Sequence, residues 1–182
     1  MNENLTLRPS PCSKGVNAAV AKKLAPAIAA WMEDGASAAD VEPDLVKTLS
    51  IRSDGYELAK ALEERCGYSP DAQLVEILNR VGSLRQIECD RLQEAWVKAR
   101  GFTGPAIGAR VAFTLDDQDC EGEVLSNSAA GTSLVFCPAL GHVREGLGSH
   151  GRYFPWEQLK EAAHAQPKKR RRNSCSPSAQ QT

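Results

Sequence analysis

Three glycines in the run GLGSHG have the spacing used by phosphate-binding loops. Gly146, Gly148 and Gly151 match the G-x-G-x-x-G pattern, in which backbone N–H groups at a helix N-terminus cradle a pyrophosphate. That chemistry needs a strand before the glycines, a helix after them and then a second parallel strand. The residues after Gly151 begin with the extended stretch RYFP and are too few for such a unit. We therefore predict a mobile loop between two strands, of the kind that can still carry binding.

Two further groups have the residue types that ligate metals. An acidic run begins like a calcium-binding EF-hand loop, but Ser128 stands at the twelfth position, where a bidentate glutamate is needed. Two cysteines and two histidines have the types for zinc, but their C-x16-C-x4-H-x7-H spacing matches no zinc pattern. The two groups are Asp117, Asp119, Glu121 and Gly122, and Cys120, Cys137, His142 and His150. We expect an acidic hairpin turn, reduced thiols, and neither a metal nor a cofactor.

No pattern in the chain places a nucleophile beside a base. The sequence contains neither a G-x-S-x-G elbow nor a P-loop. We therefore expect a protein that is not an enzyme, and keep a small enzyme or metal-binding protein as the third hypothesis. Without an apolar leader or a run of about 20 apolar residues, the sequence favours a cytosolic protein with no membrane contact.

The near-zero net charge of −1 hides a strong asymmetry. The run KKRRR, Lys168 to Arg172, lies in a polar segment that should be disordered. Residues 102–166, in contrast, carry 4 basic and 8 acidic side chains. An acidic surface of this kind repels phosphate and suits a protein partner or a basic peptide. In a eukaryotic cell the basic run would resemble a nuclear import signal.

Apolar periodicity and start signals predict a small helical bundle over residues 15–101. Pro26 should kink or split the first helix, and Pro43 should begin the second. Asp54, Ser69 and Ser83 should cap the following three. The first expected helix covers about residues 16–33, and the second begins at residue 43. The last three cover residues 54–66, 69–82 and 83–100. The apolar stripe of the last helix consists of Leu84, Ile87, Leu92, Ala95, Trp96 and Ala99.

After Pro105 the apolar period changes toward two, which predicts short strands. The expected strands cover 110–114, 122–125, 133–137 and 152–155, with turns at 116–119 and 127–131. A G-x-x-V start, an acidic turn, a G-x-V strand and a closing aromatic-P-x-x-x-L follow in this order. This order resembles SH3-like small barrels, and the resemblance implies a small closed barrel over residues 105–165.

The prediction is a segregated α+β protein in four zones. These zones are an irregular N-terminus (1–14), a helical domain (15–101), a small SH3-like β-barrel domain (105–165) and a disordered basic tail (166–182). The leading hypothesis is a cytosolic interaction or regulatory protein whose acidic β domain binds an unidentified protein. The candidate partner-binding residues are Asp116, Asp117, Asp119, Glu121, His142, His150, Arg152, Tyr153 and Trp156.

The alternative is a nucleic-acid-associated protein that uses the last helix and the basic tail. A helix-turn-helix formed by 54–66 and 69–82 is disfavoured, because Asp71 and Glu76 lie on the helix that would face the phosphates. The candidate nucleic-acid-binding residues are Arg85, Arg91, Lys98, Arg100, Lys168, Lys169, Arg170, Arg171 and Arg172.

Overall fold

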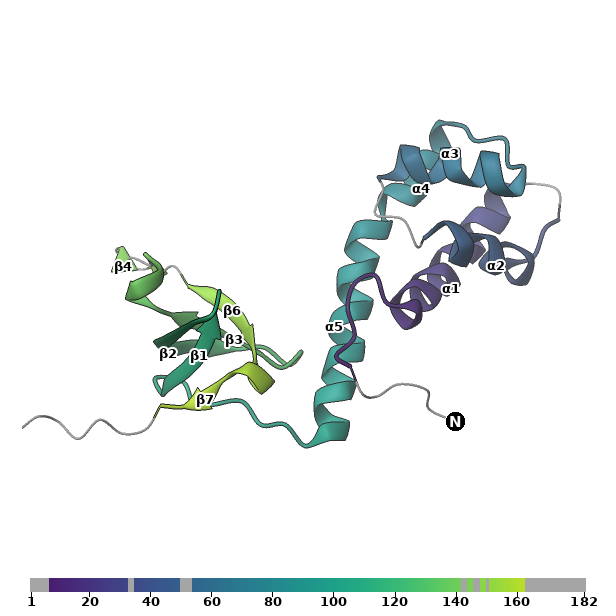
Figure 1. Ribbon diagram of the computed structural model, residues 1–182. Helices are drawn as coiled ribbons and strands as arrows, with labels where there is room; N and C mark the ends of the chain where they lie inside the picture. Colours follow the sequence, from purple (N-terminus) through teal and green to yellow (C-terminus); the bar gives the residue numbers. More distant parts are fainter. Residues whose placement is uncertain are drawn as a thin grey trace, which may run out of the picture.

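The computed structural model describes residues 7–32, 35–49, 54–141, 144–145, 148–149 and 151–162. Its helices come first and its strands second, so the expected segregated α+β class is confirmed. Figure 1 shows the helical part (residues 7–100) beside the sheet part (residues 105–162), with α5 reaching from one toward the other. The helices are α1 (Lys14–Trp31), α2 (Ala38–Thr48), α3 (Gly55–Cys66), α4 (Ala72–Asn79) and α5 (Val81–Arg100).

Side-chain caps begin α1, α3 and α4, and a capping box begins α2. Asp54 accepts from the Glu57 N–H at the start of α3, as expected, and Ser13 accepts from the Val16 N–H at the start of α1. Asp71, and not Ser69, caps α4, with its carboxylate 2.9 Å from the Leu74 N. The carboxylate of Asp71 therefore satisfies one of the free N–H groups at that helix N-terminus.

Two expected helix starts are wrong. Helix α2 begins at Ala38, and Ser37 and Asp40 form its capping box, so Pro43 lies inside it. Ser83 lies inside α5, where its hydroxyl donates to the Arg80 carbonyl. Pro26 does not split the first helix, which covers Lys14–Trp31. At Pro26 and Pro43 the cap and the buried apolar face outweigh a single unfavourable residue.

The helical part has its own core, formed mainly by leucine, isoleucine, valine and alanine of α1 to α5. In this core α1 packs against α2, α4 and α5. The apolar periodicity predicts Val20, Leu24, Ile28 and Trp31 on one face of the first helix, and Leu74, Ile77, Leu78 and Val81 on one face of the fourth. All are buried except Trp31 and Ile77, which are half-buried at the edge of the core. None of the helices in the described ranges is long and apolar enough to cross a bilayer.

The sheet part forms a second core around Val111, Phe113, Val124, Val135 and Phe154. Its strands are β1 (Arg110–Leu115), β2 (Gln118–Asn127), β3 (Thr132–Phe136), β6 (Arg152–Pro155) and β7 (Lys160–Glu161). They form an antiparallel sheet in the order β6-β3-β2-β1-β7. The two edge strands do not pair, so the sheet is open and the expected closed barrel is wrong. A two-residue β7, which follows the 3₁₀ turn Trp156–Gln158, is too short to join both edges.

The first hairpin turns more tightly than expected. Only Asp116 and Asp117 form the turn, with φ of 49° and 61°, whereas Gln118 and Asp119 already pair with β1. Two successive positive φ values match the right-handed twist of the flanking strands, and aspartate tolerates them better than most residues. Asp119 and Glu121 consequently lie on β2, where successive side chains point to opposite faces of the sheet.

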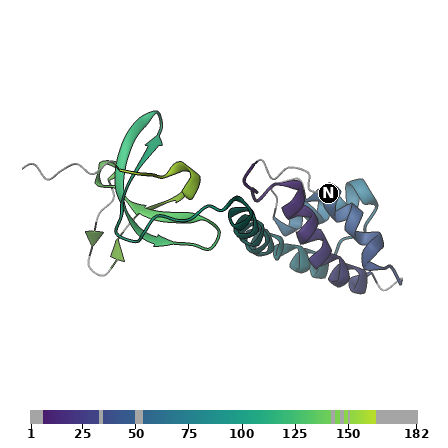
Figure 2. The ribbon, with the colours of Figure 1, turned by 90° about the horizontal axis from the view of Figure 1, so that it is seen from below.

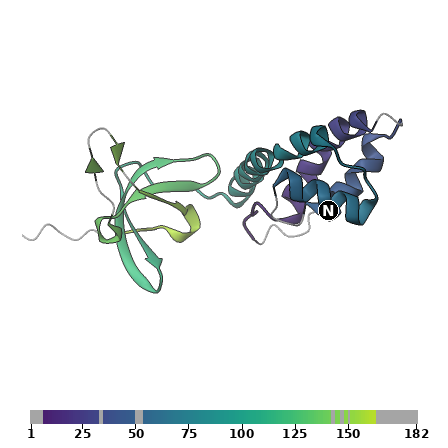
Figure 3. The same cartoon turned by 90° about the horizontal axis from the view of Figure 1, so that it is seen from above.

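The glycine run lies between β3 and β6 in the chain. The described residues there form a small hairpin, in which β4 (Arg144–Glu145) pairs with β5 (Gly148–Ser149). Figures 2 and 3 show this hairpin at the end of the sheet part away from the helices. The strand that follows, β6, is antiparallel to β3, which is incompatible with a dinucleotide-binding unit. His142, Gly146 and His150 lie outside the described residues.

A buried carboxylate joins α1 to α5. Glu88 is 1% exposed, and its oxygens lie 2.5 Å from Lys23 Nζ and 2.8 Å from Arg91 Nε. The contact with Lys23 lowers the pKa of Glu88 most, and Arg91 adds to this, against the opposing effect of burial. The ionised form is therefore favoured in the folded protein.

Two glycines on the helices provide a paired test of packing. A methyl group at Gly55 would lie 2.6 Å from the Val75 carbonyl oxygen, whereas one at Gly82 meets no atom within 4 Å. We expect Gly55→Ala to lower the free energy of unfolding by about 1–3 kcal/mol through overpacking. Gly82→Ala should raise it by about 0.5–1 kcal/mol, because alanine restricts the unfolded chain. Urea denaturation of both variants measures this, and equal effects would contradict the close approach of α3 to α4.

The ion pairs of Glu88 make stability depend on pH. A lowered folded-state pKa stabilises the protein above the unfolded value of about 4.3, and the stabilisation is lost as the pH falls through the folded pKa. We expect Glu88→Gln to cost about 1–2 kcal/mol at pH 7, since both cations are partly solvated. The difference in the free energy of unfolding between Glu88→Gln and the parent should shrink below about pH 4. Chemical denaturation across pH measures this, with the exposed Glu76→Gln as control; a pH-independent difference would contradict the assignment.

Candidate functional site

One face of the sheet is turned away from the sheet core and carries two kinds of side chain. Asp119, Glu121 and Glu123 of β2 alternate with residues of the buried face. Phe136 is the cross-strand neighbour of Glu123, and Leu134 lies two residues before it on β3. Residues two apart on a strand share a face. The carboxylates therefore lie beside an apolar strip on what we call the outer face.

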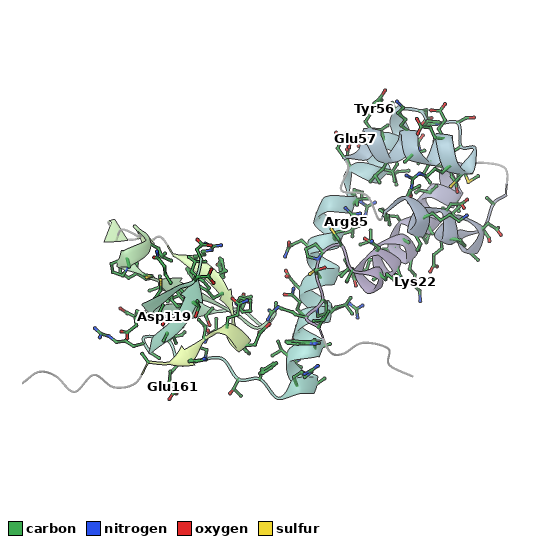
Figure 4. The ribbon with its side chains drawn as sticks, in the orientation of Figure 1. Lys22, Tyr56, Glu57, Arg85, Asp119 and Glu161 are labelled. Carbon is green, nitrogen blue, oxygen red and sulfur yellow. The ribbon has the colours of Figure 1, made fainter. Side chains whose placement is uncertain are left out.

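The outer face is hollowed near the acidic residues. A cavity of about 260 Å³ is lined by Arg110, Glu121, Gly122, Glu123, Phe136 and Pro138. Asp119, labelled in Figure 4, lies two residues before Glu121 on β2 and does not line this cavity. Asp119 is exposed, and its carboxylate lies 3.2 Å from the hydroxyl of Thr114 across the strand pair. The two carboxylates outnumber the one guanidinium of Arg110 in this lining. A hollow with net negative charge and an aromatic ring suits a lysine or arginine side chain, whose apolar stem needs cover as well as its charge.

The apolar strip continues to β6. Tyr153 is paired with Leu134 and is 62% exposed. Arg152 is exposed and lies over the Phe154 ring, with 5.8 Å from Cζ to the ring centroid. Trp156 is half-buried, and its ring packs on Gly104 of the connecting segment. Of the three predicted binding residues here, Tyr153 and Arg152 are accessible, whereas Trp156 mainly packs the connection between the two parts.

A single arginine links the two parts of the molecule. Arg8 Nη1 donates to both carboxylate oxygens of Glu157, at 2.8 and 3.1 Å. Nη2 donates to the Ala130 carbonyl and, at 3.3 Å, to Gln93 on α5. Its guanidinium also lies over the Trp96 ring, 5.8 Å from the centroid. The N-terminal segment, predicted to be merely irregular, therefore holds α5 against the sheet part.

Apolar contacts complete this junction. Trp96, Val97 and Ala130 are buried there, and the Val97 side chain packs directly on Gly131, whose φ is 78°. Phe102 stacks on Trp96 with 5.3 Å between ring centroids. We expect the charge-assisted hydrogen bonds of Arg8, together with these buried apolar contacts, to keep the two parts in one orientation.

A groove runs beside the junction, between α5 and the β2–β3 turn. It measures about 680 Å³ and is open to solvent. Its α5 wall consists of Gln86, Ile87, Asp90, Arg91, Gln93 and Glu94, and its sheet wall of Ser128, Ala129, Ala130, Thr132 and Tyr153. We call it the junction groove. Sequence reasoning missed it because Ile87 was assigned to the buried stripe of α5.

The predicted phosphate-binding surface on α5 is not assembled. Arg85 is 8% exposed and donates to the Leu49 carbonyl inside the helical part, so its assignment to a phosphate-facing surface is wrong (Figure 4). Arg91 pairs with Glu88 and Lys98 with Glu94, at 2.8 and 2.7 Å. Arg100 lies over the Trp96 ring. The five basic residues of the tail, 168–172, lie outside the described residues.

The structure brings together two of the four predicted metal-type residues. Cys120 of β2 and Cys137, which directly follows β3, are both buried in the sheet core. Burial raises the pKa of the Cys120 thiol most, and the neighbouring Cys137 raises it further. The neutral thiol is therefore favoured at Cys120. Among the described residues no group of three or more ligands for a metal is found.

Arg8 provides a direct test of the junction. We expect Arg8→Ala to raise amide hydrogen exchange of residues 128–132 by about tenfold, because the β2–β3 turn loses its charged partner. Arg8→Lys should restore only part of the protection, since lysine lacks the planar fork that reaches Glu157 and Ala130 together. Lys22→Ala, an exposed cation on α1, is the control. Unchanged exchange in Arg8→Ala would show that the apolar contacts of Trp96 and Val97 hold the junction without the hydrogen bonds of Arg8.

The chain matches no protein-family model, no curated protein and no solved structure. What it binds is therefore inferred from its own surfaces. Two further hollows, of about 440 and 570 Å³, lie on the helical part.

Proposed function

We propose that this protein is a non-enzymatic interaction or regulatory protein whose sheet part binds a basic segment of another protein. The observation that carries the proposal is the arrangement of β2, which turns Asp119, Glu121 and Glu123 to one face beside Phe136 and Leu134. Charge and apolar cover are both present on one accessible surface. A segment rich in lysine or arginine, with an apolar residue nearby, complements it.

The energetics favour a weak and reversible complex. Each exposed ion pair contributes about 0–1 kcal/mol, and salt screens it within about 10 Å at 0.1 M. The half-buried Phe136 and Leu134 have little apolar area left to cover. Binding through the outer face should therefore depend strongly on ionic strength, as suits a regulatory contact that forms and dissociates quickly.

Two finer expectations belong to the same proposal. The meander β1-β2-β3, the return strand β6 and the 3₁₀ turn before β7 support an open variant of an SH3-like module. A cytosolic location suits the reduced thiols and the acidic outer face.

Nucleic-acid association remains the alternative, and it now depends on the basic tail. Arg85 is buried, and Arg91 and Lys98 are held in ion pairs with neighbouring carboxylates. Five tail cations would bind a polyanion weakly and with strong salt dependence. Loss of DNA binding on deletion of residues 167–182 would make the tail a tether; binding retained by residues 1–166 would favour a reading surface on the body.

Charge reversal on the outer face tests the leading proposal. A short synthetic peptide of lysine and leucine is titrated into the labelled protein at low salt, followed by NMR. We expect shifts at residues 119–123, 134 and 136, and binding weakened about tenfold in the double variant Asp119→Lys/Glu121→Lys. The variant Glu63→Lys/Glu76→Lys makes the same change in net charge on the helical part. Equal weakening in both double variants would mean that net charge, and not the outer face, attracts the peptide.

A further inference from the structure

Exposed large apolar side chains are few in the described residues, and two of them line one cavity. Leu7, Val46, Tyr56, Ile87, Ile107 and Tyr153 are the exposed ones. Ile87, 54% exposed, and Tyr153, 62% exposed, lie on opposite walls of the junction groove. Isolated exposed apolar residues need no explanation, but a facing pair in one hollow marks a binding surface.

The two walls belong to different parts of the molecule and are held in place. Arg8 joins α5 to Ala130 on the sheet wall, and Val97 packs on Gly131 next to it. Gln93, which lines the groove, also donates to the Pro9 carbonyl at 2.7 Å. A preformed groove loses little conformational entropy when an occupant binds.

The charged side chains on the α5 wall indicate which kind of peptide the junction groove can bind. Arg91 is engaged by Glu88, and Glu94 by Lys98. Asp90 accepts a hydrogen bond from the Gln86 amide at 2.8 Å, and within the described part of the chain it forms no ion pair. Asp90 lies one helical turn from Ile87, so its carboxylate and the apolar side chain face the same space. A cation next to an apolar side chain would meet both.

We infer that the junction groove binds a segment of a partner protein in which a large apolar side chain stands beside a lysine or arginine. The apolar side chain inserts between Ile87 and Tyr153, and the cation pairs with Asp90. The groove is open to solvent, which suits a continuous peptide better than a small ligand that must be largely enclosed. This binding does not require the acidic outer face, so it extends the proposed function to a second surface that includes α5.

The test is a selection with a displayed library of random short peptides against the full-length protein. We expect enriched peptides to carry an aromatic or large aliphatic residue adjacent to lysine or arginine. Synthetic copies should bind about tenfold more weakly to Ile87→Glu and to Asp90→Lys. Val46→Glu is the matched control, because Val46 is an exposed aliphatic residue on α2 that does not line the groove, and its affinity should stay within about twofold of the parent. Thermal melting of each variant confirms that it is folded.

Three results would overturn the inference: a selection that yields no peptide above background, an acidic consensus, or an affinity that Ile87→Glu leaves unchanged. The double variant Asp119→Lys/Glu121→Lys separates this inference from the proposed function. Peptides that keep their affinity for that variant and lose it for Ile87→Glu support the groove. Peptides with the opposite pattern bind the outer face, which would support the proposed function and overturn the groove.

Discussion

The guanidinium of Arg8 holds together three stretches that are distant in the chain. It contacts α5 through Gln93 and Trp96, and the sheet part through Ala130 and Glu157. Planar, charge-assisted donors suit this role, because one group satisfies a carboxylate, a carbonyl and an aromatic face at once. Without such contacts between them, two parts with separate cores would be expected to move relative to each other. The groove and its two apolar walls depend on this contact.

Helix α5 serves two partners, and this explains its irregular pattern. Near its start Arg85, Glu88 and Cys89 are buried against the helical part, whereas near its end Trp96 and Val97 are buried at the junction. A helix that packs one face along its whole length shows a single apolar stripe. A helix that changes partner midway does not, and it leaves Ile87 exposed on the side that neither partner covers.

The outer face and the junction groove differ in chemistry and meet at Tyr153, which is paired with Leu134 and also lines the groove. The outer face offers carboxylates on a solvent-exposed strand surface with a shallow hollow, where ion pairs are weak and screened by salt. The groove offers two exposed apolar side chains and the carboxylates of Asp90 and Glu94, so burial of apolar surface contributes more to binding and ionic strength affects it less.

The sequence by itself determined the order of elements, since apolar period and turn residues are local properties. The α+β class, the Asp54 cap, the first hairpin and a strand over residues 152–155 all follow from short stretches. Only the tertiary structure decided which edges of the sheet stay open, that Pro43 lies inside α2, and that Arg85 is buried while Ile87 is not. The contacts of Arg8, more than a hundred residues apart along the chain, have no local signal. Packing between distant segments sets these features, and periodicity within one segment cannot report which partner it will meet.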